Sequence, residues 1–350
     1  MTIQDQLDKN RRTVSFDNYD ITVRQLFLMI SENQIILKPE YQRHFVWDAI
    51  RQSQLIESIF LGIPIPNLFM ATNKDSTWEV VDGLQRLTTI VNFIGEEETR
   101  LRTNAKSVKL RLTGLDKLSS MNEKYFEELP ISVQQMFYTR PIRITVLNDK
   151  SDFNVRFDLF ERLNTGGVTL HPQEIRNCVY IGNFKNFIIE CSKNEDFNSC
   201  VKMTDASERN GNREELILKF FAYFEDRSLF EHSVKEFLND YMAKKTKTFV
   251  NKEQLSRLFL DSFKIINNLL PNGIVRGNRI NTTPLVLYEA ITIGIADLVQ
   301  NNQTDFITND KLQSLLNDEN LKRLTTGATN SRSKLYGRID YVKDFILNAV

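Results

Sequence analysis

The segment WEVVDGLQRLTTIVNFI, residues 78–94, places an acid, a glycine, an amide and a base within five positions, from Asp82 to Arg86. Apolar residues before Asp82 predict a strand, and the apolar spacing after Gly83 predicts a helix that ends at Gly95. A strand that passes directly into a helix leaves the first N–H groups of the helix unpaired and turns the positive end of its dipole toward the junction. The junction is therefore a candidate site for an anion such as a nucleotide phosphate.

The side chains at this junction suit that chemistry. Gly83 permits a sharp turn and the close approach of a ligand, while Gln85 and Arg86 supply donors to phosphate oxygens. Asp82 would repel a phosphate unless it holds Mg²⁺ or orients a water, so we assign it a catalytic and metal-binding role, with Gln85 as the second catalytic candidate. In the structural alternative, Asp82 caps the helix and Arg86 is solvated.

A second segment, KPEYQRHFVW at residues 38–47, is predicted to be extended because of its proline. Period-two alternation then places Tyr41 and Arg43 on the same side, where a stacking ring and a bidentate donor can bind one nucleotide. Trp47 is expected to anchor the core. Asp48 is the predicted N-cap of the next helix, which Gly62 is placed to end.

A third segment, FERLNTGGVTLHPQEIRN at residues 160–177, links two predicted helices through a glycine pair. The pair suits a left-handed helix end, which is a purely structural role. Asn164 nevertheless projects beside a loop rich in backbone donors and is a candidate nucleotide ligand. Glu174 and Arg176 follow on the next helix, which His171 is expected to begin, so a small polar ligand is the alternative to a structural role.

Composition limits the classes of function. The chain of 350 residues has 45 Lys plus Arg and 45 Asp plus Glu, so no global charge attracts it to nucleic acid or membrane. Three cysteines without CxxC spacing argue against a disulfide framework or a zinc site and fit a reducing compartment. The polar N-terminus and the lack of a long apolar run favour a cytoplasmic protein without membrane contact.

Periodicity predicts an α+β fold with two lobes. Residues 15–180 are expected to form an N-terminal lobe with a small sheet, including a hairpin across 63–81 and a strand at 141–147. Residues 205–350 are expected to form an all-helical lobe, because segments 213–224, 235–245, 252–270, 284–299 and 336–347 each show the 3.6-residue period. The basic stretch 100–111 is either a solvated strand edge or a phosphate contact surface.

Taken together and in order, PEYQRHFVW, LIESIFLGIPIPNLF, WEVVDGLQRLTTIVNF, FERLNTGGVTLHPQEIRN, REELILKFFAYF and TTGATNSRSKLYGRIDYVKDFIL resemble the N-terminal domain family of GmrSD-type, modification-dependent restriction systems. That family is similar to the ParB and sulfiredoxin fold, in which a strand, a turn and a helix with a Gly and an Arg hold nucleotide phosphates. The resemblance implies Mg²⁺-dependent NTP binding and hydrolysis in prokaryotic defence, together with a separate nuclease or other effector protein.

The sequence departs from the family at two points. The family signature Asp-Gly-Gln-Gln-Arg corresponds to residues 82–86, where Leu84 replaces the first Gln, which brings hydrolysis into question while leaving phosphate binding. Many members also carry a C-terminal HNH nuclease domain. The scattered histidines of this chain show no such pattern, so we do not expect it to cut DNA.

Two further functions compete with nucleotide binding. One is a non-catalytic, ParB-like DNA-binding module that uses residues 100–111 and the GATNSRSK loop, with Arg332, Lys334 and Arg338 as candidate DNA or phosphate contacts; the balanced net charge argues against it. The other is a nuclease in which Asp82 and Glu79 hold metals. We expect this arrangement to fail, because residues three apart on a strand point to opposite faces unless a bulge intervenes.

Overall fold

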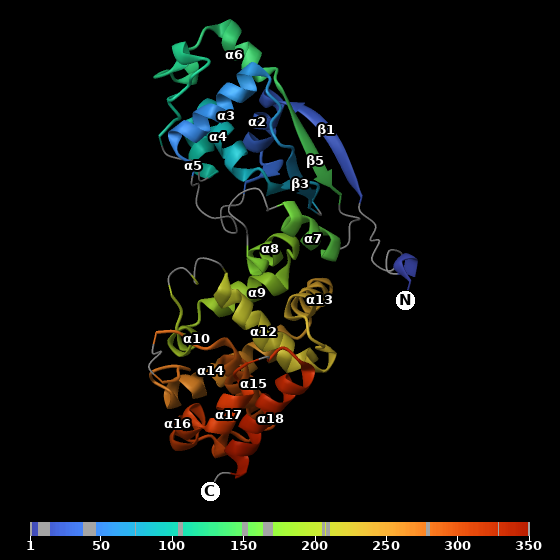
Figure 1. Ribbon diagram of the computed structural model, residues 1–350, viewed down its shortest axis with the longest axis vertical. Helices are drawn as coiled ribbons and strands as arrows, with labels where there is room; N and C mark the ends of the chain where they lie inside the picture. Colours follow the sequence, from blue (N-terminus) through green and yellow to red (C-terminus); the bar gives the residue numbers. More distant parts are fainter. Residues whose placement is uncertain are drawn as a thin grey trace. The chain divides into compact units, whose positions relative to one another are not determined.

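The computed structural model describes residues 2–5, 15–37, 47–73, 75–103, 108–148, 153–163, 171–204, 207, 211–277, 281–327 and 329–348. They belong to two compact units, Met1–Leu170 and His171–Val350. The first unit combines helices with a small sheet, and the second is built from helices (Figure 1). The predicted α+β fold with a helical C-terminal part is confirmed.

The sheet of the first unit has five strands in the order β1-β5-β3-β4-β2. Antiparallel pairing joins β1 to β5 and β3 to β4, while β3 runs parallel to β5 and β2 runs parallel to β4. The predicted hairpin and the predicted strand at 141–147 are thereby confirmed. The strands are β1 (Phe16–Thr22), β2 (Ile35–Ile36), β3 (Leu68–Thr72), β4 (Trp78–Asp82) and β5 (Pro141–Leu147).

A β-bulge interrupts the hairpin just before the candidate site. Glu79 pairs with Ala71, whereas Asp82, three residues further along β4, pairs with Phe69, only two residues away on β3. One extra residue on β4 therefore shifts, by one position, the alternation of its side chains between the two faces of the sheet. Since Ala71 and Phe69 share a face, this register puts Glu79 and Asp82 on one face of the sheet as well. The expectation that these two carboxylates point to opposite faces is wrong.

Helices of the first unit begin and end largely where their capping residues predict. Thr22 caps α2 through its side chain, and Asp48 Oδ1 accepts the backbone N–H of Arg51 at 2.7 Å to cap α3. Gly62 ends α3 with a φ of 70°, in the left-handed region. The helices are α2 (Val23–Ser31), α3 (Ala49–Leu61), α4 (Leu84–Ile94), α5 (Glu97–Arg102), α6 (Ile131–Tyr138) and α7 (Phe153–Leu163), with 3₁₀ turns at Ser119–Met121 and Phe126–Glu128.

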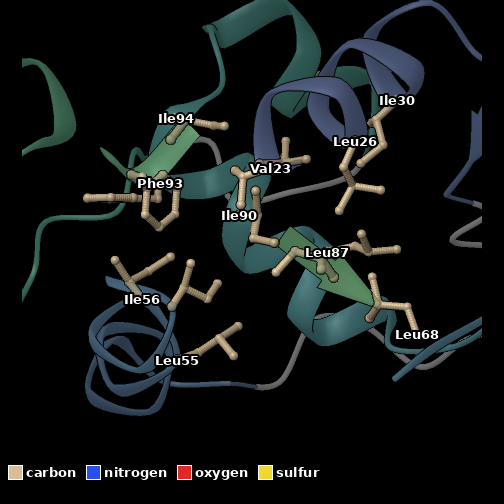
Figure 2. Packing of buried hydrophobic residues seen from close by; sticks show 14 of the residues in the cluster. Val23, Leu26, Ile30, Leu55, Ile56, Leu68, Leu87, Ile90, Phe93 and Ile94 are labelled. Carbon is tan, nitrogen blue, oxygen red and sulfur yellow. The ribbon is translucent and has the colours of Figure 1, made fainter. Parts of the chain in front are cut away.

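One apolar core holds this unit together. Figure 2 shows Leu26 of α2, Ile56 of α3 and Leu68 of β3 converging on Leu87 and neighbouring residues of α4. Every residue of α4 from position 86 to position 94 is buried, including its polar side chains. The helix that begins at the candidate site is therefore fixed on all sides, which keeps its first turn in place.

The second unit contains the helices that the 3.6-residue period predicts, and these are confirmed. Its three cysteines are buried thiols, and burial raises the pKa of Cys191 and of Cys200 to about 12, so both of these thiols stay protonated. The helices are α8 (Pro172–Val179), α9 (Asn183–Ser192), α10 (Glu195–Cys200), α12 (Asn212–Asp226), α13 (Val234–Lys247), α14 (Lys252–Leu269), α15 (Leu285–Gln300), α16 (Asn309–Asn317), α17 (Glu319–Leu324) and α18 (Arg332–Asn348), with 3₁₀ turns at Arg227–Leu229 and Thr304–Phe306. Within the residues placed by the structure, none of the helices is both long and apolar enough to cross a membrane.

Candidate functional site

The predicted junction forms as a single-residue turn. β4 ends at Asp82, α4 begins at Leu84, and Gly83 between them adopts a φ of 107°. A Cβ atom on Gly83 would lie 2.3 Å from Leu68 Cδ2, so both the backbone angle and the available space require glycine. Glycine has no side chain to cap the helix. The first turn of α4 thus retains the anion-binding character that its sequence predicts.

Asp82 and Arg86 form an ion pair across the first turn. Arg86 Nη2 donates to Asp82 Oδ2 at 2.6 Å, and Arg86 Nη1 donates to the carbonyl oxygens of Pro66 and, at 3.3 Å, Asn67. Only 9% of Arg86 is exposed, and this burial lowers its pKa while the charge of Asp82 opposes the change. The structural alternative is wrong on both points, because Asp82 does not cap α4 and Arg86 is not solvated.

This pair determines how a ligand can enter. The Asp82 side chain is 32% exposed and that of Arg86 is 11% exposed, so solvent reaches the carboxylate more easily than the guanidinium. A phosphate would compete with Asp82 for Arg86 Nη2. The guanidinium occupies Asp82 Oδ2, so Mg²⁺ at Asp82 would bind through Oδ1 or displace Arg86 from Oδ2. The donor set fits Mg²⁺ bound through one carboxylate and substrate phosphates.

Gln85 connects the junction to the second motif. Its Oε1 accepts the backbone N–H of Trp47 at 3.4 Å. Trp47 packs against the core beneath the guanidinium of Arg51, which lies 4.8 Å from the ring centroid, so its predicted role as an anchor is confirmed. Trp47 is the last residue of the motif 38–47, and this bond connects it to α4. Tyr41 and Arg43 themselves lie outside the described residues, as does Asn164, and their roles stay predictions.

The bulge brings a second carboxylate to the face that carries Asp82. Glu79 is only 4% exposed, and α7, which buries Phe157 and Phe160, packs against β4. The geometric objection to a metal site built from Glu79 and Asp82 therefore no longer holds. Across the ranges that the structure covers, however, no group of three or more His, Cys, Asp or Glu is arranged to hold a metal ion. A cation here would need ligands from a bound substrate.

Sequence reasoning missed a buried polar network behind the junction. The Gln52 side chain, 2% exposed, donates to the carbonyl oxygens of Trp47 and Asp48 at 3.2 Å each. Its Oε1 accepts Asn92 Nδ2 at 3.0 Å, which joins α3 to α4. If α4 is assumed to be amphipathic, with one apolar face, a polar residue such as Asn92 is expected to face solvent. The available signal was that α4 carries apolar residues on more than one face, which predicts that its polar residues are buried too.

In its described residues, 100–103 and 108–111, the basic stretch forms neither a strand edge nor a free phosphate surface. It begins in α5, and its cations that the structure describes are already engaged. Arg100 donates to the Gly95 carbonyl at 2.9 Å and Arg102 to the Ser31 carbonyl at 2.7 Å. Of the other two described cations, Lys109 forms an ion pair with Glu127 and Arg111 forms one with Glu123.

The C-terminal candidates differ from one another. Arg332 and Lys334 are exposed at the start of α18. Arg338 is 1% exposed, and its guanidinium donates to Glu289 Oε2 at 2.5 Å and to the Thr329 carbonyl at 2.9 Å. The first two residues are accessible to a phosphate, whereas the third belongs to the interior of the second unit.

The third motif also contributes to that interior. Glu174 accepts the backbone N–H of His171 at 2.7 Å, which confirms His171 as the start of α8. Arg176 is 1% exposed and pairs with Glu215 at 3.0 Å and with Asn239 at 2.8 Å. Their contacts are those of a structural network.

Comparison with known proteins identifies one family. Residues 23–181 match the family model of the GmrSD restriction endonuclease, N-terminal domain. This range contains the β4–α4 junction and all three sequence motifs. No curated protein and no solved structure matches the chain. The predicted family is confirmed for this part of the chain.

Proposed function

We propose that this chain, which carries a GmrSD-type N-terminal domain and so fits a component of a restriction-type defence system, binds and hydrolyses a Mg²⁺–nucleoside triphosphate at the β4–α4 junction. A separate effector protein would respond to the bound nucleotide. The observation that supports this proposal most directly is the Asp82–Arg86 pair at the uncapped start of α4. The kinship with ParB and sulfiredoxin stays a prediction from sequence.

Nucleotide binding would proceed by an exchange of partners. In the free protein, Asp82 and Arg86 neutralise each other at 2.6 Å. An incoming Mg²⁺–NTP offers a cation to Asp82 and an anion to Arg86, so each charge can leave its partner without being left uncompensated. The two carbonyl oxygens of residues 66 and 67 would keep the guanidinium beside the junction during this exchange.

Hydrolysis would use the same residues. A metal supplies charge stabilisation and a polarised water when it is bound, and Asp82 would hold it. Gln85 stands in the first turn of α4, where its amide can orient a water or a phosphate oxygen. Leu84 packs against the apolar core. Its replacement of the family's glutamine therefore leaves these polar groups in position.

A DNA-binding module without catalysis is the second candidate. It is favoured by the exposure of Arg332 and Lys334 at the start of α18. The engaged cations of residues 100–111 count against it, because they cannot release counterions from DNA without first breaking internal contacts.

Calorimetric titration of ATP and of GTP, each with Mg²⁺, tests the proposal. Arg86→Ala should weaken binding by about thirtyfold or more, the effect of losing one charge-assisted contact of about 2 kcal/mol. Arg100→Ala is the matched control, because Arg100 is equally buried at 8% exposure and also donates to a backbone carbonyl. Equal NTP affinities for wild type and Arg86→Ala would place the site elsewhere.

Asp82→Asn separates binding from chemistry. It should reduce Mg²⁺-dependent NTP turnover more than NTP affinity, because removing a negative charge beside phosphates favours the ground state. Turnover is measured as released phosphate at saturating nucleotide. An unchanged rate would exclude Asp82 from the mechanism.

A further inference from the structure

The second unit contains a pocket of about 250 Å³ that the nucleotide site does not involve. It lies where α12 and α15 begin. The N-cap residues of these helices, Gly211 and Pro284, supply no side-chain cap, and the first turn of α12 carries Glu214 and Glu215. Its lining residues carry hydroxyl, amide, ammonium and carboxylate groups, and Met203, Leu216 and Leu285 are its apolar members. The polar residues of the lining include Lys202, Thr204, Ser207, Asn212, Lys219 and Thr283.

Lys219 is a buried cation whose charge is incompletely matched. It is 7% exposed, and its Nζ lies 3.8 Å from Glu215 Oε1 and 3.4 Å from Glu289 Oε1. A guanidinium lies closer to each of these carboxylates, Arg176 to Glu215 at 3.0 Å and Arg338 to Glu289 at 2.5 Å. The Lys219 ammonium donates no hydrogen bond to any residue described in the structure. Buried ammonium groups ordinarily donate hydrogen bonds, so this one is short of acceptors.

Lys202 is a second lysine in the lining. Its backbone N–H donates to Thr283 Oγ1 at 2.9 Å, and its carbonyl accepts the Thr283 N–H at 2.9 Å. These two bonds join Lys202 to Thr283 within the lining. The Thr283 hydroxyl accepts one of them, so its own proton can be donated to another acceptor. Within the described ranges no carboxylate lies within ion-pair distance of the Lys202 ammonium. Glu215, the acid in the lining, is already held by Arg176.

We propose that this pocket binds a single phosphate group, either as the free ion or as the monoester of a small molecule. Lys219 and Lys202 neutralise the phosphate, while hydroxyl groups of Thr283 and Thr204 and the amide of Asn212 donate to its oxygens. The start of α15, which has no acidic residue in its first turn and no side-chain cap from Pro284, favours the same charge. Leu216 and Met203 leave room for a short apolar part of a monoester. This site is independent of the nucleotide site, because all of its residues belong to the second unit.

Titration of the full chain with inorganic phosphate, followed by calorimetry, tests this site. We expect saturable binding that Lys219→Met and Lys202→Ala each weaken about tenfold, as for one charge-assisted contact. Lys264→Met is the matched control, because Lys264 is an exposed lysine on α14 outside the pocket lining. Circular dichroism establishes whether each variant folds. If Lys219→Met does not fold, the phosphate affinity of Lys202→Ala alone tests the site.

The Arg86→Ala protein separates the two proposed sites. Phosphate binding through the second-unit pocket should persist in Arg86→Ala, even if NTP binding at the junction is lost or was never present. Adenosine monophosphate then distinguishes the two sources of phosphate: tighter binding than inorganic phosphate assigns a monoester, and weaker binding assigns the free ion. The pocket proposal is overturned if wild type shows no saturable phosphate binding, or if both lysine variants bind as wild type does.

Discussion

Two carboxylate–guanidinium pairs of nearly equal length occupy different settings in the two units. Asp82 and Arg86 lie 2.6 Å apart in the first unit, and Glu289 and Arg338 lie 2.5 Å apart in the second. The Asp82 side chain is 32% exposed, whereas the Glu289 and Arg338 side chains are 6% and 1% exposed. A ligand can reach the first pair but not the second. Access, more than distance, separates a candidate binding pair from a structural one.

The surroundings of the two pairs reinforce this difference. Arg86 lies in the first turn of a helix whose N-cap residue, Gly83, has no side chain to cap it. Close packing and a left-handed backbone explain why this position is glycine. Arg338 instead continues a buried chain of alternating charge through Glu289, Lys219 and Glu215 to Arg176. Buried charges of this kind depend on one another, because removing one leaves its neighbour without compensation.

Arg338→Met should have the largest effect on stability. It leaves the buried Glu289 carboxylate with Lys219 at 3.4 Å as its remaining cation, and we expect a loss of about 3 kcal/mol in the free energy of unfolding. Urea denaturation measures the loss, and hydrogen exchange read by mass spectrometry should place it in α15 and α18. Arg332→Met is the control on the same helix, because Arg332 is exposed and its removal should cost less than about 0.5 kcal/mol.

The double variant Glu289→Gln/Arg338→Met sharpens this test. Removing both charges should recover part of the stability that Arg338→Met loses, because the penalty arises mainly from the stranded carboxylate. If Arg338→Met and Arg332→Met are equally stable, the second unit does not depend on its buried charge, and the contrast between the two pairs fails.

Gly83→Ala should have the next largest effect and should act on the first unit. The new Cβ meets Leu68 Cδ2 at 2.3 Å in a backbone with φ of 107°, so we expect a loss of about 2 kcal/mol in the free energy of unfolding. Gly327→Ala is the control, because Gly327 has a φ of 80° but nothing within 4 Å of its added Cβ. We expect Gly327→Ala to lose about 1 kcal/mol in the free energy of unfolding, which measures the backbone strain alone. Equal costs for both variants, measured by urea denaturation, would show that the contact with Leu68 relaxes freely.

The local part of the candidate site could be predicted from the sequence. The strand, the turn at Gly83 and the helix that follows depend on residues close together in the chain, as do the caps at Thr22, Asp48 and His171. The helices of the second unit follow from the spacing of their own apolar residues. Each of these features could be predicted because it is decided by residues within one or two turns of the chain.

The contacts of Arg86 and the face of Glu79 could not be predicted in this way. Arg86 reaches the carbonyl of Pro66, twenty residues earlier in the chain. Glu79 shares a face with Asp82 only because the pairing with β3 contains a bulge, and regular alternation predicts the reverse. Arg332 is exposed and Arg338 is buried, and the burial of Arg338 likewise depends on Glu289, 49 residues away in the chain. Each outcome is set by a distant partner that the local sequence does not name.

The smallest effect is expected at a pair that is exposed on the sheet of the first unit. Arg143 donates to Asp20 Oδ1 at 2.9 Å and to Oδ2 at 2.6 Å, yet both side chains are more than half exposed, at 58% and 52%. The hydrogen bond from Arg143 lowers the pKa of Asp20 below its ordinary value. Because the pKa is lower in the folded state, any stabilisation by this pair is present above the unfolded pKa and is lost as the pH falls through the folded pKa.

Asp20→Asn should therefore change the thermal unfolding midpoint at pH 7 by no more than the experimental error, because water screens the exposed pair. Any small difference from wild type should disappear in acid, where Asp20 is protonated. Asp17→Asn on the same strand is the control, since Asp17 is also exposed and forms no ion pair with any residue that the structure describes. A loss at pH 7 as large as that of Arg338→Met would mean that bidentate geometry outweighs exposure. The two pairs compared above would then differ for a reason other than access to solvent.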